Sequence, residues 1–262
     1  MKIYFILFAF LAMFTTPSLA QPARSAARTT DMDIYLLMGQ SNMAGRGKLS
    51  DAFQADTVSD ILMLNKANEW VRAKHPLHFD KPVAAVGPGL AFGIKMAAAS
   101  PGKTIGLIPC AVGGTSIDKW KPGAYDAATQ THPWDDAKVR IKEGMKYGVI
   151  KGVIWHQGES DSNADSAALY LEKLKTLIER TRKLTGDLRL PFVAGELGRY
   201  KENYNLINAV LVDLPSTVPY TTVVSSEGLN HNGDGIHFDA TSADELGKRY
   251  AKAMLDLLKN RN

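Results

Sequence analysis

A chain of 262 residues with 45% hydrophobic and 22% charged side chains has the balance of a globular protein, which excludes a wholly disordered chain and a membrane protein with many spans. The formal net charge is +4, and the lysines and arginines are scattered rather than clustered, so the sequence predicts no binding to nucleic acid. A single cysteine, Cys110, excludes an internal disulfide, and we expect it to be a buried thiol rather than a nucleophile.

The first twenty residues have the three parts of a secretory signal peptide. Lys2 gives a positive start, residues 3–14 are apolar, and Ser18-Leu19-Ala20 ends with small residues at both cleavage positions. The alternative is a membrane anchor, but the apolar run is shorter than the roughly 20 residues that a spanning helix needs. We therefore expect cleavage after residue 20 and secretion or export to the periplasm, with no membrane attachment afterwards. Residues 21–32 then form an N-terminal linker, and residues 33–262 form a single domain.

Short apolar runs alternate with amphipathic stretches along this domain. The runs are apolar throughout instead of alternating, which is typical of buried strands in a parallel sheet. They lie at residues 33–38, 61–64, 104–108, 152–155, 192–194 and 221–224. Helical stretches lie at residues 90–99, 137–147, 166–184, 205–214 and 242–258. This order predicts an α/β fold, a three-layer α/β/α sandwich around a mostly parallel sheet of five to six strands.

Two further stretches predict a helix start and a long loop. Ser242, followed by Glu245 three residues later, has the pattern of a capping box and predicts the start of the last helix. Residues 113–132 show little periodicity, so we expect them to form a long loop at the active site.

Ligands of open parallel sheets bind at the carboxyl ends of the strands, so the residues just after each run are the candidates for a site. Ser41 closely follows the first run, between Gln40 and Asn42. A serine at this place can be a nucleophile, although it is also a common helix N-cap. Gly113 and Gly114 follow the third run, and His156, Gln157 and Glu159 follow the fourth.

Asp234 and His237 are three residues apart near the C-terminal end of the domain. On a turn, a carboxylate at this spacing can accept from one imidazole nitrogen and leave the other nitrogen free as a general base. The neighbouring Asn-Gly-Asp-Gly sequence also permits a plain turn in which the aspartate caps the backbone. Hydrolysis of an ester further needs hydrogen-bond donors for the oxyanion, for which the N–H of Ser41, a glycine N–H and the Gln157 amide are candidates.

Together these segments resemble the SGNH-hydrolase superfamily, and within it the sialate O-acetylesterase and acetylxylan-esterase branch, carbohydrate esterase family 6. The resemblance is carried by four blocks in the order of the family. They are Gly39-Gln40-Ser41-Asn42-Met43-Ala44-Gly45, the segment from Pro109 to Ile117, Trp155-His156-Gln157-Gly158-Glu159-Ser160, and Asp234-Gly235-Ile236-His237-Phe238. The third block carries Gln157 where most SGNH relatives carry asparagine, and the branch resembled here also carries glutamine.

The resemblance implies a role for each matched residue. Ser41 would be the nucleophile, His237 the general base and Asp234 the acid that orients it. The N–H of Ser41, that of Gly113 or Gly114, and the Gln157 amide would form the oxyanion hole. The implied substrate is an acetylated carbohydrate of the xylan or sialic acid type, and no metal or organic cofactor is implied.

The sequence leaves two possible roles open for several residues. Glu159 is a second acid or a buried carboxylate that holds loops together. Trp120 stacks on a sugar ring or packs in the core. Gln40, Asn42 and His156 support the site or contact substrate. The sets His156 with Glu159, and His231, Asp234 and His237, could also be read as metal ligands, which would leave Ser41 without a role.

Two other functions compete with the carbohydrate acetylesterase. One is a lipase or thioesterase on the same fold, which would need an apolar groove for an acyl chain. The other is a noncatalytic carbohydrate-binding protein on an esterase scaffold, which would be expected to lack a member of the Ser41, His237 and Asp234 set.

Overall fold

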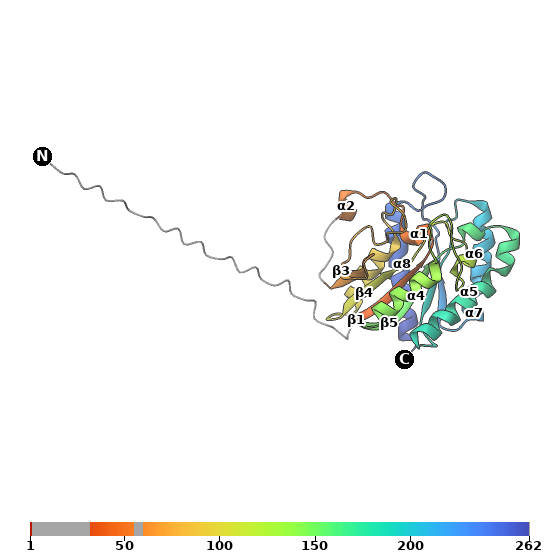
Figure 1. The fold of residues 1–262 in the computed structure, drawn as a ribbon. Helices are drawn as coiled ribbons and strands as arrows, with labels where there is room; N and C mark the ends of the chain where they lie inside the picture. The colour runs from red at the N-terminus through yellow and green to blue at the C-terminus, as the bar shows by residue number, and fades with distance from the viewer. Residues whose placement is uncertain (2–31, 55–59, 262) are drawn as a thin grey trace.

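The computed structural model describes residues 1, 32–54 and 60–261, and Figure 1 shows their course. The proposed signal peptide and nearly all of the proposed linker lie outside the described residues. The first strand begins at Met32, the last residue assigned to that linker. Across the described part of the chain, no helix combines the length and the apolar character needed to cross a bilayer.

The centre of the molecule is a seven-stranded sheet in the order β3-β2-β4-β1-β5-β6-β7. Its strands are β1 (Met32–Gly39), β2 (Ile61–Leu64), β3 (Trp70–Arg72), β4 (Thr104–Pro109), β5 (Gly148–His156), β6 (Phe192–Gly195) and β7 (Thr221–Val224). All neighbouring pairs are parallel except β2 and β3, which are antiparallel. The predicted mostly parallel sheet is confirmed, and it has one strand more than the upper predicted number.

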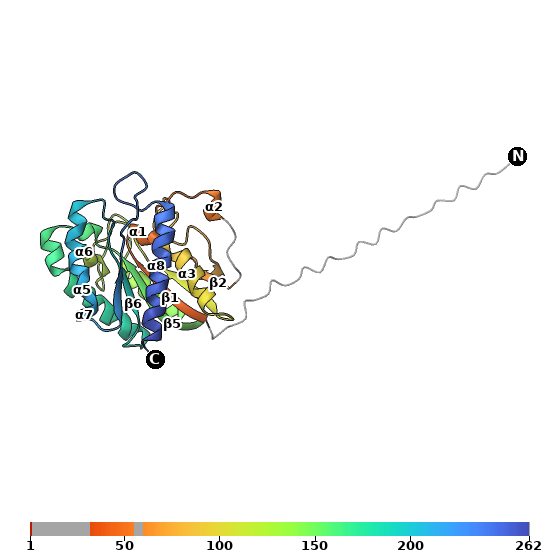
Figure 2. The ribbon, with the colours of Figure 1, turned by 180° about the vertical axis from the view of Figure 1, so that it is seen from behind.

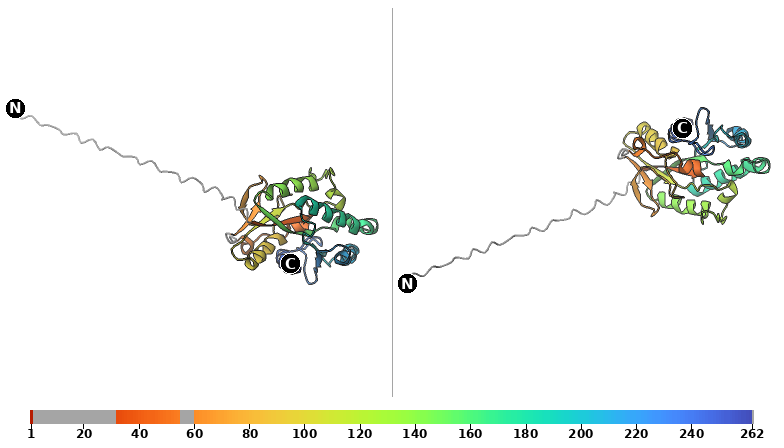
Figure 3. Two further views of the ribbon diagram at one scale, coloured as in Figure 1. Left: turned by 90° about the horizontal axis from the view of Figure 1, so that it is seen from below. Right: turned by 90° about the horizontal axis from the view of Figure 1, so that it is seen from above.

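Helices cover both faces of the sheet. One face carries α4 (Pro133–Gly144), α5 (Ala164–Thr185), α6 (Asn205–Val212) and α7 (Leu214–Thr217), as Figure 1 shows. The opposite face carries α3 (Pro88–Ala99) and α8 (Ala240–Lys259), which lie in front of the sheet in Figure 2. The views along the sheet in Figure 3 show the three layers. The predicted α/β/α sandwich is therefore confirmed.

Strand β1 contributes side chains to the core on both faces of the sheet, because successive side chains along a strand point to opposite faces. Ile34, Leu36 and Met38 pack on the side of α4 and α5. Tyr35 and Leu37 point the other way and pack with the residues of α3 and α8. Both sets are buried, which is why the sequence of this strand is apolar throughout.

The last helix begins at a different residue from the one that the capping-box pattern predicts. Asp239 is the N-cap of α8, and its carboxylate accepts the N–H of Ser242 at 2.7 Å. The Ser242 hydroxyl instead accepts the N–H of Asn230 at 2.8 Å. Ser242 is thus inside the first turn, and its side chain fixes the preceding loop rather than the helix end.

The strand order places a topological switch point at β1. From β4, on one side of β1, the chain passes through α4 to β5 on the other side. Loops that follow neighbouring strands diverge at such a point and leave a crevice at the carboxyl ends of the strands. Three short elements lie just after these strands, namely α1 (Ser41–Ala44) after β1, η1 (Ile117–Trp120) after β4 and η2 (Glu159–Asp161) after β5.

Candidate active site

Ser41 is the first residue of α1, and a close contact between two strands sets its position. Gly39 ends β1 with φ +134°, and a Cβ at this residue would lie 2.1 Å from the carbonyl oxygen of His156. Only glycine allows this approach. The N–H of Gln40 then donates to that same carbonyl oxygen at 2.9 Å. The chain therefore turns sharply after β1, which brings the Ser41 side chain to the crevice.

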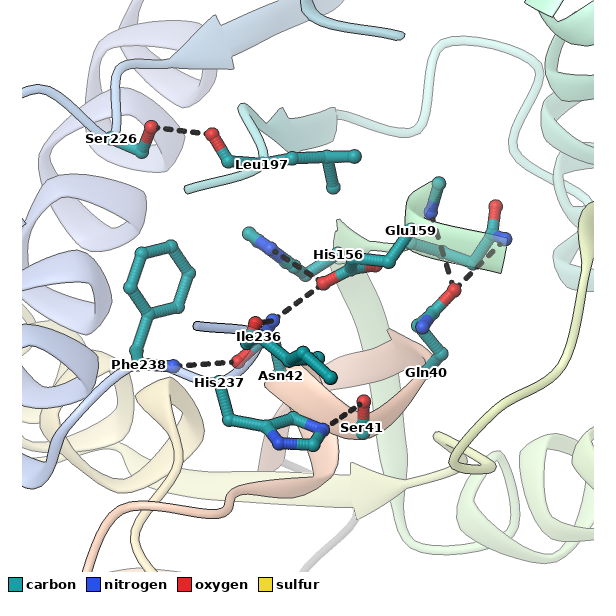
Figure 4. A network of polar contacts seen from close by, with 12 residues as sticks. Gln40, Ser41, Asn42, His156, Glu159, Leu197, Ser226, Ile236, His237 and Phe238 are labelled. Carbon is teal, nitrogen blue, oxygen red and sulfur yellow. Dashed lines mark hydrogen bonds and ion pairs between the residues drawn. The ribbon is translucent and has the colours of Figure 1, made fainter. Parts of the chain in front are cut away.

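Ser41, His237 and Asp234 form a chain of hydrogen bonds, of which Figure 4 draws the contact between Ser41 and His237. The Ser41 Oγ lies 3.0 Å from Nε2 of His237, and Nδ1 of His237 lies 2.6 Å from Oδ2 of Asp234. Because an ionised carboxylate only accepts, the proton of a neutral imidazole sits on Nδ1 and the Nε2 lone pair faces the serine hydroxyl. Ser41 then donates to His237, which is the arrangement needed for removal of the serine proton.

The Asp234 carboxylate is fixed by its own turn. Its Oδ1 accepts the N–H of Ile236 at 2.7 Å and that of His237 at 2.8 Å. Desolvation raises the pKa of this carboxyl, but the hydrogen bonds from His237 and Ile236 outweigh it and hold the pKa below the usual value. Asp234 therefore closes a turn and orients the imidazole at once, so the two readings of this segment apply together.

Two of the N–H groups that the sequence offers as oxyanion donors make no hydrogen bond to protein within the described residues. Within the described residues, neither the N–H of Ser41 nor that of Gly114 donates to a protein acceptor. The N–H of Gly113, by contrast, donates to Oδ2 of Asp80 at 2.9 Å. Of the two glycines that the sequence offers, Gly114 is thus the one with a free donor.

The carboxylate of Asp80 also pairs with a cation. Nη2 of Arg46 lies 2.6 Å from the same Oδ2, with the two side chains 7% and 2% exposed. Arg46 directly follows Gly45 and donates to its carbonyl oxygen at 2.7 Å. The pair therefore ties the end of the nucleophile segment to the loop of Gly113 and Gly114. Neither residue can be predicted from the sequence, because no motif or spacing links them to the site.

A cavity of about 340 Å³ lies beside this loop. Asp80 and Val112, the residue before Gly113, line it together with Phe79 and Thr131. The cavity combines an aromatic ring and aliphatic side chains with hydroxyl and carboxylate groups, a lining that suits a polar molecule with apolar faces.

The Gln157 side chain is not available to an oxyanion. It is fully buried, and Nε2 donates to Oε1 of Gln40 at 3.1 Å, to the carbonyl oxygen of Thr115 at 3.1 Å and to Oδ2 of Asp161 at 2.5 Å. An amide nitrogen has two hydrogens, and these three acceptors use both. Contrary to the expectation from sequence, Gln157 therefore braces the loops under the site. Gln40 shares this role, and its Oε1 also accepts the N–H groups of Gly158 and Ser160 at 3.4 Å.

Trp120 is a core residue and cannot stack on a sugar. Its side chain is only 1% exposed, and the ring packs edge-on against Trp155 with centroids 5.1 Å apart. Nε1 donates to the hydroxyl of Thr115 at 3.3 Å. The loop that carries Trp120 is thus anchored from below, which corrects the substrate-contact reading.

Behind Ser41 lies a buried polar group made of Asn42, Glu159 and His156 (Figure 4). Nδ2 of Asn42 donates to Oε1 of Glu159 at 2.5 Å, and Nε2 of His156 lies 3.7 Å from the same oxygen. Burial lowers the pKa of His156 to about 3. These side chains are enclosed by protein, so they support the site rather than contact substrate.

Burial raises the pKa of the Cys110 thiol to about 11, which agrees with a buried thiol and opposes a nucleophile at neutral pH. Among the residues that the structure describes, no group of three or more histidine, cysteine, aspartate or glutamate side chains could hold a metal ion. The two sets named above as possible metal ligands do not form such a group.

Comparisons with known proteins place most of the chain in a family of carbohydrate esterases. Residues 31–256 match the model of a family described as carbohydrate esterase, sialic acid-specific acetylesterase. A probable carbohydrate esterase of Arabidopsis thaliana is 32% identical over 255 residues, which cover 85% of this chain and 90% of the relative. An Arabidopsis thaliana crystal structure superposes with a TM-score of 0.77 at 30% identity, covering 86% of this chain and 98% of the other.

Two more distant structures share the fold. NanS has a TM-score of 0.74 at 17% identity and covers 88% of this chain and 99% of its own. A carbohydrate acetylesterase from Xanthomonas citri has a TM-score of 0.66 at 21% identity, and the match covers 87% of this chain and 56% of the other. The family match over most of the chain confirms the resemblance seen in the sequence. This chain is a carboxylic ester hydrolase that belongs to the sialic acid-specific acetylesterase family of carbohydrate esterases.

Proposed function

We propose that this carbohydrate esterase removes O-acetyl groups from sugars or polysaccharides through a covalent acetyl-enzyme on Ser41. The hydrogen-bond chain from Ser41 through His237 to Asp234 carries the proposal. An activated serine of this kind attacks esters, and its imidazole is oriented by the third group.

In the first half of the proposed reaction, Ser41 Oγ attacks the acetyl carbonyl carbon while Nε2 of His237 takes the hydroxyl proton. The carbonyl oxygen becomes an oxyanion that accepts from the N–H groups of Ser41 and Gly114. The bond between the carbonyl carbon and the sugar oxygen then breaks, and His237 gives its proton to that oxygen. The sugar leaves with a free hydroxyl, and the acetyl group stays on Ser41.

In the second half, a water molecule attacks the acetyl carbon and His237 takes a proton from it. The bond to Ser41 Oγ breaks, the proton returns to the serine and acetate leaves. Asp234 stays ionised throughout and stabilises the imidazolium that forms in each half. The low pKa of this carboxyl agrees with that role.

We infer that the sugar occupies the cavity next to the loop of Gly113 and Gly114. The Phe79 ring is partly exposed there, and the face that is not covered by the Arg140 guanidinium could pack against the apolar face of a sugar. Hydroxyl-bearing, carboxylate and cationic side chains also line the cavity. The family name and the name of the Xanthomonas citri relative favour an acetylated carbohydrate, and the family name favours sialic acid. Xylan is kept as a second candidate because of the resemblance seen in the sequence. We further propose export through the N-terminal signal peptide, which would place the enzyme in the periplasm or the medium.

The first experiment measures acetate release from acetylated xylan and from an O-acetylated sialic acid, with the mature protein and its Ser41→Ala variant side by side. The proposal expects release from at least one substrate and its loss in the variant. Release that persists in the variant would overturn the role of Ser41. An octanoate ester cleaved as fast as the acetate ester would point to a lipase or thioesterase, and binding of the sugar without hydrolysis would point to a carbohydrate-binding protein.

A further inference from the structure

The nucleophile and the base come from segments that lie far apart in sequence, and Asn42 joins them. The side chain of Asn42, the residue next to Ser41, accepts the N–H of Phe238 through Oδ1 at 3.0 Å. Its Nδ2 donates to the carbonyl oxygen of Ile236 at 3.1 Å. These two bonds clamp the main chain on both sides of His237. The two bonds span 194 and 196 residues of sequence, and they join the two catalytic segments beside the direct contact of Ser41 with His237 (Figure 4).

Glu159 fixes which way the Asn42 amide points. The second hydrogen of Nδ2 donates to Oε1 of Glu159 at 2.5 Å, so every polar atom of this buried amide has a partner. If the amide flipped, its oxygen would face the Glu159 carboxyl and the Ile236 carbonyl, while its nitrogen would face the Phe238 N–H. Two acceptor pairs and one donor pair would then oppose each other, so Glu159 acts together with the two main-chain groups to hold the orientation that clamps the His237 segment.

The environment of Glu159 favours a carboxyl group that is not fully charged. The hydroxyl of Tyr250 donates to the carbonyl oxygen of Trp155 at 2.8 Å, so it can only accept from Nδ1 of His156 at 3.1 Å. Neutral His156 then presents a bare Nε2 toward Glu159. Within the described residues, this Nε2 and Oε2 of Glu159 are both buried without a hydrogen-bond partner. Burial raises the pKa of Glu159 to about 7, although the Asn42 hydrogen bond acts the other way.

We propose that Glu159 is a positioning residue for the reaction. It holds the Asn42 amide in the orientation that clamps residues 236–238, and in this way it sets the distance between Nε2 of His237 and Oγ of Ser41. This inference rests on the proposed function only in requiring Ser41 and His237 to act as a couple. It does not depend on which acetylated sugar is the substrate.

Two variants of equal size at position 159 separate the acceptor from the bulk of the side chain. Glu159→Gln keeps an oxygen acceptor for Asn42, and its neutral amide resembles the uncharged carboxyl. Glu159→Met fills the same space without an acceptor. We expect Glu159→Gln to retain kcat within about threefold, while Glu159→Met lowers kcat by about 10- to 100-fold, because small displacements of reacting groups cost up to about 10²-fold in rate. The KM of an acetyl ester should change little in both.

Asn208 provides a matched control for Asn42. It is also a buried asparagine that clamps main chain through both amide ends, since it accepts the N–H of Leu197 at 2.7 Å and donates to its carbonyl oxygen at 3.0 Å. We expect Asn42→Ala and Asn208→Ala to lose comparable thermal stability, while only Asn42→Ala loses kcat as Glu159→Met does. If the Glu159→Met variant does not fold, Asn42→Ala still tests the clamp.

A serine-directed fluorophosphonate keeps this test apart from the test of substrate. The rate at which the probe labels Ser41, followed by intact mass, depends on the serine and its base but not on a sugar. Slower labelling in Glu159→Met with normal labelling in Glu159→Gln supports the positioning role, even if no acetylated sugar is hydrolysed. Wild-type kcat and labelling in Glu159→Met would overturn it, as would an equal loss of kcat in Asn208→Ala. Absence of labelling in the wild-type protein would overturn both proposals.

Discussion

Oδ2 of Asp80 accepts the main-chain N–H of Gly113 at 2.9 Å while it pairs with Arg46, so one buried oxygen organises the loop beside the nucleophile. Removing the carboxylate leaves the guanidinium buried with no counter-charge. We expect Asp80→Ala to lower the free energy of unfolding by about 3–5 kcal/mol, the usual cost of breaking a buried ion pair from one side. Denaturant unfolding monitored by circular dichroism measures it.

The matched control is the double variant Arg46→Ala with Asp80→Ala. Because the two charges depend on each other, the second substitution should cost much less in the Asp80→Ala background than in the wild-type protein. Additive effects of the two substitutions would contradict this coupling.

Asp234→Asn tests the tautomer of His237. The asparagine oxygen can still accept the N–H groups of Ile236 and His237, so the turn should survive. Its NH₂ group would face Nδ1 of His237 and force the proton to Nε2, which then cannot take the Ser41 proton. We expect kcat to fall by about 10⁴-fold, as in serine hydrolases that carry this change. Asp244→Asn, at a partly exposed carboxylate of α8 that pairs with Lys248, is the control and should keep full activity. An unchanged kcat in Asp234→Asn would remove Asp234 from the mechanism.

Gln157→Ala tests whether Gln157 supports the loops beneath the site or donates a hydrogen bond to the oxyanion. The substitution leaves Oδ2 of Asp161 and Oε1 of Gln40 with fewer donors and opens a buried space. We expect a loss of about 1–3 kcal/mol in the free energy of unfolding for each buried polar group left unpaired. The fall in kcat at a temperature where the variant is folded should be much smaller than the 10²–10³-fold that the loss of an oxyanion donor costs. A fall of that size with unchanged stability would return Gln157 to the oxyanion hole.

Acid should destabilise this protein through its buried histidines. Burial lowers the pKa of His156 to about 3 and those of His75 and His78 to about 4, from 6.5. Below pH 6.5 the unfolded chain therefore binds more protons than the folded one, so the free energy of unfolding falls as the pH drops toward 4. Urea unfolding at pH 7.5, 6 and 5 measures the slope, and His78→Gln should reduce it. Equal stability at all three values would contradict the assignment of neutral buried histidines.

The Glu159 carboxyl acts with the opposite sign over part of this range. Its pKa is raised from 4.5 to about 7, so the folded state holds this proton more tightly and gains relative stability as the pH falls from 7 to 4.5. The three histidines contribute more to the pH dependence than the one carboxyl does. The free energy of unfolding should therefore still fall as the pH drops. The Glu159→Gln variant lacks the opposing contribution and should lose more stability than the wild-type protein over the same interval.

The sequence predicts the inner strands well, because most of them are apolar runs that are buried in the sheet. It does not predict β3, whose three residues lie at the sheet edge with Val71 and Arg72 exposed, so burial leaves little mark on their pattern. A local cap motif predicts that α8 starts at Ser242. The actual cap is Asp239, since Ser242 is occupied by the N–H of Asn230, a contact that only the folded loop creates.

The site residues also divide into those that a local sequence pattern reveals and those that depend on contacts made only in the folded chain. Ser41 is recognisable from the first block, and Asp234 and His237 from the last one, and the structure brings the three within hydrogen-bond distance. The choice between Gly113 and Gly114 depends on an acceptor 33 residues earlier, and that distance has no periodic or spacing signal. Trp120 and Gln157 follow strands as substrate-facing residues would. Whether they point to the crevice or beneath it is decided by packing against Trp155 and Asp161.

The place of β1 between β4 and β5 implies that the two catalytic partners differ in local stability. Ser41 directly follows a central strand that is hydrogen-bonded to neighbours on both sides. His237 lies in an irregular segment that rests on side-chain contacts from Asn42 and on its own turn. Amide hydrogen exchange in β1 should therefore require unfolding of the whole domain, while residues 231–238 should exchange through small local openings. The segment that carries His237 can then open and close locally while β1, which positions Ser41, stays folded.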